Sequence, residues 1–178
     1  MLSKRDFISG AAAGLAVVIV FAANPSNNGA FDRFRAAVSD VPGWNEQKDK
    51  YQAFTAKELY GLIDGGAADY DQQGLKSGIT VTLTNESRVL EIYCDNVGKP
   101  SRAKGMVKIK RKSLSDPKPI PKVTISPAIY DGVLGGCFAC CAKGDFYIEM
   151  TLTGYEALNE AVEDAAAFIN TLSQVIAK

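Results

Sequence analysis

The sequence contains no histidine. A serine or cysteine nucleophile activated by a histidine base is therefore excluded. The same absence excludes haem attachment through Cys-x-x-Cys-His and the usual histidine-containing zinc and copper sites. An enzyme built from this chain would have to rely on carboxylates, lysine, tyrosine or thiols. We therefore expect a protein that is not an enzyme and carries no cofactor.

Net charge is also lacking, because 20 basic residues balance 20 acidic ones. No global electrostatic field attracts nucleic acid, and we expect no nucleic-acid partner. An apolar fraction of 47% is typical of globular proteins. About 150 residues follow the N-terminal segment, which is the size of one domain with its own core.

The N-terminus predicts export. Ser3–Phe7 is basic and leads into an apolar run, Ile8–Ala23, which a polar linker over 24–30 follows. The start is similar to the twin-arginine pattern Ser-Arg-Arg-x-Phe-Leu, with Lys4 at the first arginine, and a Sec signal is the alternative. The run is near the lower end of a membrane span of roughly 17–25 residues, so a cleaved signal and a single-span transmembrane anchor both stay open. Either places the body on the periplasmic face of the bacterial inner membrane.

The remaining sequence predicts an α+β domain over 31–178, with an antiparallel sheet packed by helices. Capping boxes start helices at Thr55–Glu58 and at Thr153–Glu156, and the second helix continues to about Ala177. Trp44 is expected to pack on the body. The first of these helices is predicted over 56–73, and further helices over 31–39 and 100–111. Strands are predicted over 79–84, 89–94, 123–126, 128–134, 137–142 and 145–152, and a stiff extended loop over 116–121.

Leu59–Tyr70 carries a motif of its own. It is similar to the Leu-Tyr-x-x-Ile-(Asp/Asn)-Gly-Gly-Ala-x-x-Tyr mark of a family of exported bacterial proteins known only as a domain of unknown function. Leu90–Tyr93, Ala103–Met106 and Lys143–Tyr147 agree with that family. The resemblance, from about Trp44 to the C-terminus, implies an α+β body behind an export signal. It implies no known activity, cofactor or catalytic residue, and the cysteines are not part of the family pattern.

The glycine pair inside this motif interrupts a predicted helix. The residues concerned are Asp64, Gly65, Gly66 and Ala67. Free backbone amides at such a break could bind an anion or a small ligand. The alternative is that the glycines only let the helix bend against the sheet.

The four cysteines are Cys94, Cys137, Cys140 and Cys141. An exported protein favours oxidised thiols, so a disulfide is one prediction. On one strand, Cys137 and Cys140 would lie ~10 Å apart, beyond the ~7 Å that a disulfide spans, so that Cys94 on a neighbouring strand could pair with one of them. A bend at Gly135–Gly136 would instead let Cys137 and Cys140 form a disulfide that closes a small loop. Buried thiols, a redox-active Cys-x-x-Cys pair, and a metal site made by all four remain alternatives.

A basic segment follows the second predicted strand. It lacks the interleaved aromatic residues that stack on bases. It could contact anionic lipid or an acidic partner, or form only a solvated helix face. We take Arg102, Lys104 and Lys108 as its candidate ligand-binding residues. The full set is Lys99, Arg102, Lys104, Lys108, Lys110, Arg111, Lys112, Lys118 and Lys122.

Two functional hypotheses follow from the sequence. The leading one is an exported, non-enzymatic binding module or accessory subunit of a bacterial envelope or membrane complex. The alternative is a thiol redox or metal-handling protein that uses the cysteine cluster.

Overall fold

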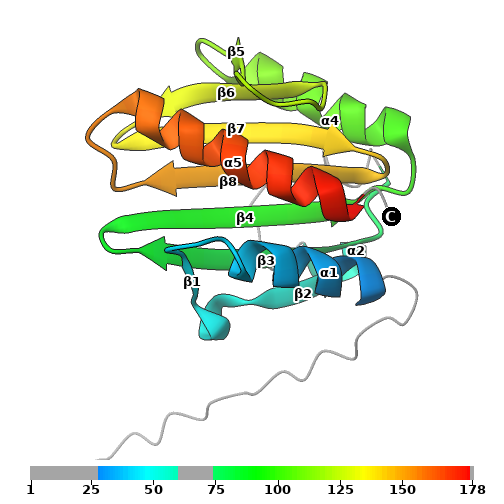
Figure 1. Cartoon of the computed structure of the whole chain (residues 1–178). Coiled ribbons are helices and arrows are strands. Elements are labelled where there is room, and N and C mark those ends of the chain that lie inside the picture. Colours follow the sequence, from blue (N-terminus) through cyan, green and yellow to red (C-terminus); the bar gives the residue numbers. More distant parts are fainter. Residues whose placement is uncertain (1–27, 60–73, 177–178) are drawn as a thin grey trace, which may run out of the picture.

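The computed structural model describes residues 28–59 and 74–176 of the chain. These residues form one antiparallel sheet of eight strands with helices on both faces (Figure 1). The strand order is β1-β3-β4-β8-β7-β6-β5, and β2 pairs with β3 on the same side as β1. The predicted α+β class, with its long C-terminal helix, is confirmed.

The elements have the following bounds. The helices are α1 (Asn28–Ser39), η1 (Lys48–Lys50), α2 (Ala56–Leu59), α4 (Pro100–Ser113) and α5 (Leu158–Ile176). The strands are β1 (Asn45–Glu46), β2 (Gln52–Thr55), β3 (Ser77–Asn85), β4 (Arg88–Asn96), β5 (Lys118–Pro119), β6 (Ala128–Val133), β7 (Gly136–Lys143) and β8 (Phe146–Thr153).

Helices α1 and α5 lie across one face of the sheet and enclose the larger core (Figure 1). The apolar stripe of α5 faces inward, as its spacing predicts. The Trp44 ring meets Phe168 of α5 edge to face, with ring centroids 5.3 Å apart. Trp44 is buried. Its predicted packing on the body is confirmed.

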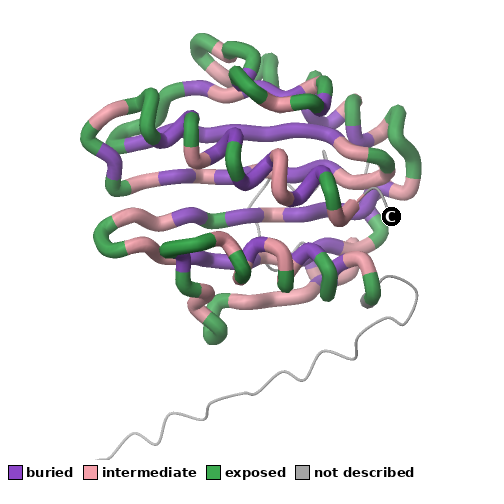
Figure 2. Tube along the Cα trace, in the orientation of Figure 1, coloured by how far each residue is buried: buried purple, intermediate pink, exposed green. Residues whose placement is uncertain are grey.

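The opposite face of the sheet carries α4, which lies over β7 and β8. Strand β7 is therefore covered on both sides, and Figure 2 shows it buried along almost its whole length. Its sequence, Gly-Cys-Phe-Ala-Cys-Cys-Ala-Lys, is nearly continuous in small and apolar residues because neither face meets water. Burial on both faces suits the three cysteines of this strand, Cys137, Cys140 and Cys141.

The half of the first capping box in which Glu58 reaches back to Thr55 forms as predicted. The amide and the hydroxyl of Thr55 both donate to the Glu58 carboxylate at 2.8 Å. The second capping box does not form. Thr153 ends β8, Gly154 turns the chain at φ 85°, and the Tyr155 amide donates to the Gly135 carbonyl at 2.9 Å. Helix α5 therefore begins only at Leu158.

Three other predictions need correction. The 123–126 segment is a loop, not a strand, because Pro121 and Pro127 lack amides for a ladder and Lys122 has φ 59°. Helix α1 begins inside the segment expected to be a linker. The predicted 116–121 loop contains the short strand β5, and most of the predicted 56–73 helix lies outside the described residues.

Within residues 28–59 and 74–176, no helix combines the length and the apolarity needed to cross a membrane. The predicted leader over 1–23 lies outside these ranges.

Candidate functional site

Helix α4 presents a row of cations to solvent. Pro100 at its first turn suits a helix start, since proline has no amide that the first turn would leave unpaired. Ala103, Met106 and Val107 bury one side of the helix. The opposite side is exposed, and its basic residues recur at the i, i+4, i+7 and i+8 spacing of one helix face. This basic stripe consists of Lys104, Lys108, Arg111 and Lys112.

The basic stripe has no ion-pair partner among the described residues. Three of the other predicted cations have such a partner, whereas Lys99 and Arg102 have none among the described residues. Lys110 pairs with Glu149 at 3.1 Å, Lys118 with Asp116 at 2.8 Å, and Lys122 with Glu163 at 3.3 Å. Four of the six cations without an ion-pair partner among the described residues therefore share one face of α4.

Arg102 does not belong to this face. Its guanidinium lies against Gly74, where a side chain would collide with it, and it is half-buried. The structure therefore brings two of the three predicted ligand-binding cations together, Lys104 and Lys108, and separates the third. The other predicted ligand-binding residues, Asp64, Gly65, Gly66 and Ala67, lie outside the described residues.

The cysteines do not form the predicted disulfide. All four are free and buried. Cys137 and Cys141 face the α5 side, whereas Cys140 faces the α4 side because side chains alternate along a strand. Cys94 on β4 and Cys141 on β7 both pair in register with Ile148 of β8, which separates them by a full strand. The prediction that Cys94 lies on a strand next to that of the other cysteines is wrong.

The same placement argues against redox and metal chemistry at this cluster. Burial raises the pKa of Cys137 and of Cys140 to about 12, and raises the pKa of Cys94 and Cys141 as well. A reactive cysteine needs a lowered pKa and access to solvent. In the described part of the chain, no three His, Cys, Asp or Glu side chains converge on a metal position. Thiols on opposite faces of a sheet cannot share one ion.

A partly buried polar network connects α4 to the sheet, and no local sequence pattern predicts it. The Tyr147 hydroxyl donates to Glu149 Oε2 at 2.7 Å, and Lys110 of α4 pairs with the same carboxylate. Lys110 Nζ also lies 5.0 Å from the centroid of the Phe138 ring. These contacts fix α4 on β7 and β8 and so orient the basic stripe outward.

Asp95 lies on β4, next to this network. It pairs in register with Gly78 of β3 on one side and with Tyr147 of β8 on the other, and it is 1% exposed. Neither carboxylate oxygen has a hydrogen-bond partner among the described residues. Burial, and then the charge of Glu149, raise the pKa of Asp95. A side chain at Gly78 would collide with Asp95, so the glycine makes room for this carboxyl group.

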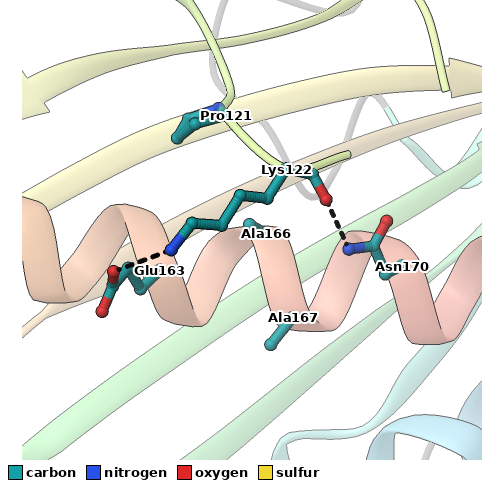
Figure 3. Close-up of a pocket in the computed structure, with 6 residues that line it drawn as sticks. All are labelled: Pro121, Lys122, Glu163, Ala166, Ala167 and Asn170. Carbon is teal, nitrogen blue, oxygen red and sulfur yellow. Dashed lines mark hydrogen bonds and ion pairs between the residues drawn. The ribbon is translucent and has the colours of Figure 1, made fainter. Parts of the chain in front are cut away.

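A surface depression of about 290 Å³ lies between the 121–122 loop and α5 (Figure 3). Its polar groups already bind one another. Lys122 Nζ pairs with Glu163, and the Asn170 amide donates to the Lys122 carbonyl at 3.0 Å. We assign it no ligand. The lining residues are Pro121, Lys122, Glu163, Ala166, Ala167 and Asn170.

The fold is similar to a solved structure, the extracellular domain of PknH from Mycobacterium tuberculosis. The match has a TM-score of 0.50 and 12% sequence identity, and it covers 80% of this chain and 91% of that chain. At this identity the likeness shows the fold alone. No protein-family model and no curated protein matches the chain.

Proposed function

We propose that this chain is an exported, non-enzymatic binding module that docks on an anionic surface through the basic stripe of α4. The basic N-terminus and the apolar run after it, which are typical of an export signal, support a location outside the cytoplasm. The fold is also shared with a domain described as extracellular. The bacterial membrane is the anionic surface that such a location offers.

One observation carries the proposal. Lys104, Lys108, Arg111 and Lys112 lie on one exposed helix face and have no ion-pair partner in the described part of the chain. A basic residue near an anionic membrane contributes about 1 kcal/mol, and the attraction decays within a Debye length of about 8 Å at physiological salt. Four cations on one helix face suffice for weak, reversible docking that is sensitive to ionic strength.

The test compares the full-length chain on neutral phosphatidylcholine vesicles and on vesicles with 30% phosphatidylglycerol. Any insertion of the leader contributes to both affinities, and Lys4 and Arg5 of the leader are the same in every variant, so a change in the ratio of the two affinities between variants isolates the part of α4. We expect tighter binding to the anionic vesicles, and we expect the ratio to fall in high salt and when Lys104, Lys108, Arg111 and Lys112 are all changed to Gln.

A matched control removes the same charge elsewhere. Lys48, Lys50, Lys57 and Lys76 are exposed and lie outside α4. Changing these four residues to Gln should leave most of the preference for anionic vesicles intact. An equal loss in the two quadruple variants would show that net charge, not the α4 face, governs binding, and would overturn the proposal.

A further inference from the structure

Apolar side chains are exposed at the end of the sheet where β6 turns into β7. Leu134 at the turn is 99% exposed, Val133 is 40% exposed and Leu158 at the start of α5 is 42% exposed. Leu158 adjoins this turn, because its Cδ2 lies 3.5 Å from the position of a Cβ on Gly132. We call Val133, Leu134 and Leu158 the apolar tip. A lone exposed leucine is ordinary, but turns favour polar residues and glycine, and here three apolar side chains gather.

The backbone beneath the tip is held firmly. The Gly135 carbonyl accepts the Tyr155 amide at 2.9 Å. The Asp131 carboxylate accepts amide hydrogens from Gly132 at 2.8 Å, Ser115 at 2.7 Å and Asp116 at 3.0 Å. These bonds fix the turn on both sides. Leu134 therefore projects from a rigid hairpin and is exposed without any rearrangement.

The same bonds bring the end of α4 beside the tip. Asp131 binds the chain where it leaves α4, and Lys110 lies over the ring of Phe138, the residue that pairs with Asp131 in register. Leu134 is three residues beyond Asp131, about 10 Å along the strand. The C-terminal end of the basic stripe, Arg111 and Lys112, is thus within roughly one to two Debye lengths of the tip.

Acidic residues at this end lie on both sides. On the side of α4, Asp116 pairs with Lys118 at 2.8 Å, and three backbone amides bind the Asp131 carboxylate. On the side of α5, Glu156 is exposed and follows Tyr155, while Glu160 pairs with Arg88 at 2.6 Å. The side toward α4 therefore adds the basic stripe to a paired and a hydrogen-bonded carboxylate, whereas on the side toward α5 Arg88 alone pairs with both Glu160 and Asp164. An anionic surface would favour contact through the tip and the α4 side together.

We infer that the apolar tip inserts into the boundary between headgroups and acyl chains of an anionic bilayer while the basic stripe lies on the headgroups. This inference rests on the proposed function and adds the apolar contact to it. Apolar side chains next to exposed cations are the pattern of interfacial membrane binding. Three side chains are too few for a stable protein interface, which buries about 1,000 Å² or more.

The test places a reporter at the tip. Leu134→Trp adds a second tryptophan to a chain whose own Trp44 is buried, and the wild-type chain serves as the spectral blank. On vesicles with 30% phosphatidylglycerol, we expect a blue shift and strong quenching by lipids brominated near the headgroup. Asp49→Trp, on exposed η1 at the other edge of the sheet, should show neither.

A second variant measures the contribution to affinity. Leu134→Ser removes a fully exposed side chain, so its thermal unfolding should match that of the wild type, while its affinity for anionic vesicles falls roughly tenfold. Binding that depends on α4, but with no quenching at position 134 and no loss in Leu134→Ser, would overturn this inference and leave the proposed function standing. Equal binding to neutral and anionic vesicles would overturn both.

Discussion

Cys94 and Cys141 face the same side of the sheet with strand β8 between them. Each pairs in register with Ile148, so their Cα atoms lie about 10 Å apart across two strand spacings. A disulfide spans at most about 7 Å. A bond between these thiols would require β4 and β7 to become neighbours, which means rebuilding the sheet.

The cysteines should therefore be free and unreactive in the folded protein. With the pKa of Cys137 and of Cys140 raised to about 12 by burial, almost no thiolate exists at pH 7. We expect no labelling by a thiol reagent over minutes in buffer. Alkylation in denaturant without reductant should modify all four, as counted by intact mass. Two unmodified cysteines in that spectrum would restore the disulfide hypothesis.

Replacing Asp95 should stabilise the protein at neutral pH. Its pKa is raised in the folded state by burial and by Glu149, so the folded chain holds the proton more tightly than the unfolded chain. Stability then declines as pH rises above the unfolded pKa of about 3.9. Asp95→Asn removes this penalty, and we expect a gain of at least about 1 kcal/mol at pH 7.

The pH dependence provides the check on Asp95. The gain from Asp95→Asn, measured by urea unfolding, should shrink toward pH 4, where the wild-type carboxyl is protonated in both states. Glu91→Gln, at an exposed position on the same face of β4, is a matched control and should change little. A wild-type stability that rises between pH 5 and pH 7 while Asp95→Asn stays flat would contradict the assignment.

Glu46 should stabilise the packing of α1, and its contribution to stability should change with pH in the opposite direction to that of Asp95. Burial opposes its ionisation, but hydrogen bonds from Arg35 at 2.6 Å and Ser39 at 2.7 Å outweigh burial and lower its pKa. Its contribution is therefore present above the unfolded pKa and is lost as pH falls through the folded one. We expect Glu46→Gln to cost about 1–2 kcal/mol at pH 7 in urea unfolding.

An exposed ion pair provides the comparison for Glu46. Glu160 is 46% exposed at its side chain and pairs with Arg88, so Glu160→Gln should cost no more than about 0.5 kcal/mol. The cost of Glu46→Gln should fade below about pH 4. If the two variants lose equal stability at every pH, the Arg35–Glu46 pair has no special role.

Gly136 should not tolerate a side chain. A Cβ there would collide with the backbone carbonyl of Leu152 in the paired strand β8, where no flexible side chain can move aside. Gly136→Ala should destabilise by about 3 kcal/mol or more, as severe overpacking does. Gly29→Ala on α1, whose Cβ would lie 3.6 Å from Arg33, should be neutral or slightly stabilising. Thermal unfolding of both variants decides the comparison.

Local patterns predicted most of the elements because their causes are local. The alternation around Ile79–Thr84 and the apolar stripe of α5 identified a strand and a helix that the structure contains. The Thr153–Glu156 pattern failed because the amide of Tyr155 donates to the carbonyl of Gly135, a residue of the turn between β6 and β7. A capping motif competes with such tertiary bonds, and no local pattern reveals them.

The candidate site was predictable in part. Helical spacing alone puts Lys104 and Lys108 on one face, and strand alternation puts Cys137 and Cys140 on opposite faces. Leu134 was visible as an apolar residue in a glycine-flanked turn, which was a usable signal. The burial of Asp95 could not be predicted from the sequence, because it depends on which strands flank β4.

The pairing of β4 with β8 has a consequence for how the chain folds. The β3–β4 hairpin and the β6–β7–β8 meander each join strands that are close in sequence, whereas Val89 must find Thr153 across more than 60 intervening residues. Closing such a loop costs conformational entropy before any contact compensates for it. The two halves of the sheet can form separately, and the pairing of β4 with β8 is then the slow step that completes the sheet. Until it closes, each half presents an open strand edge to its neighbours, and this is when aggregation competes with folding.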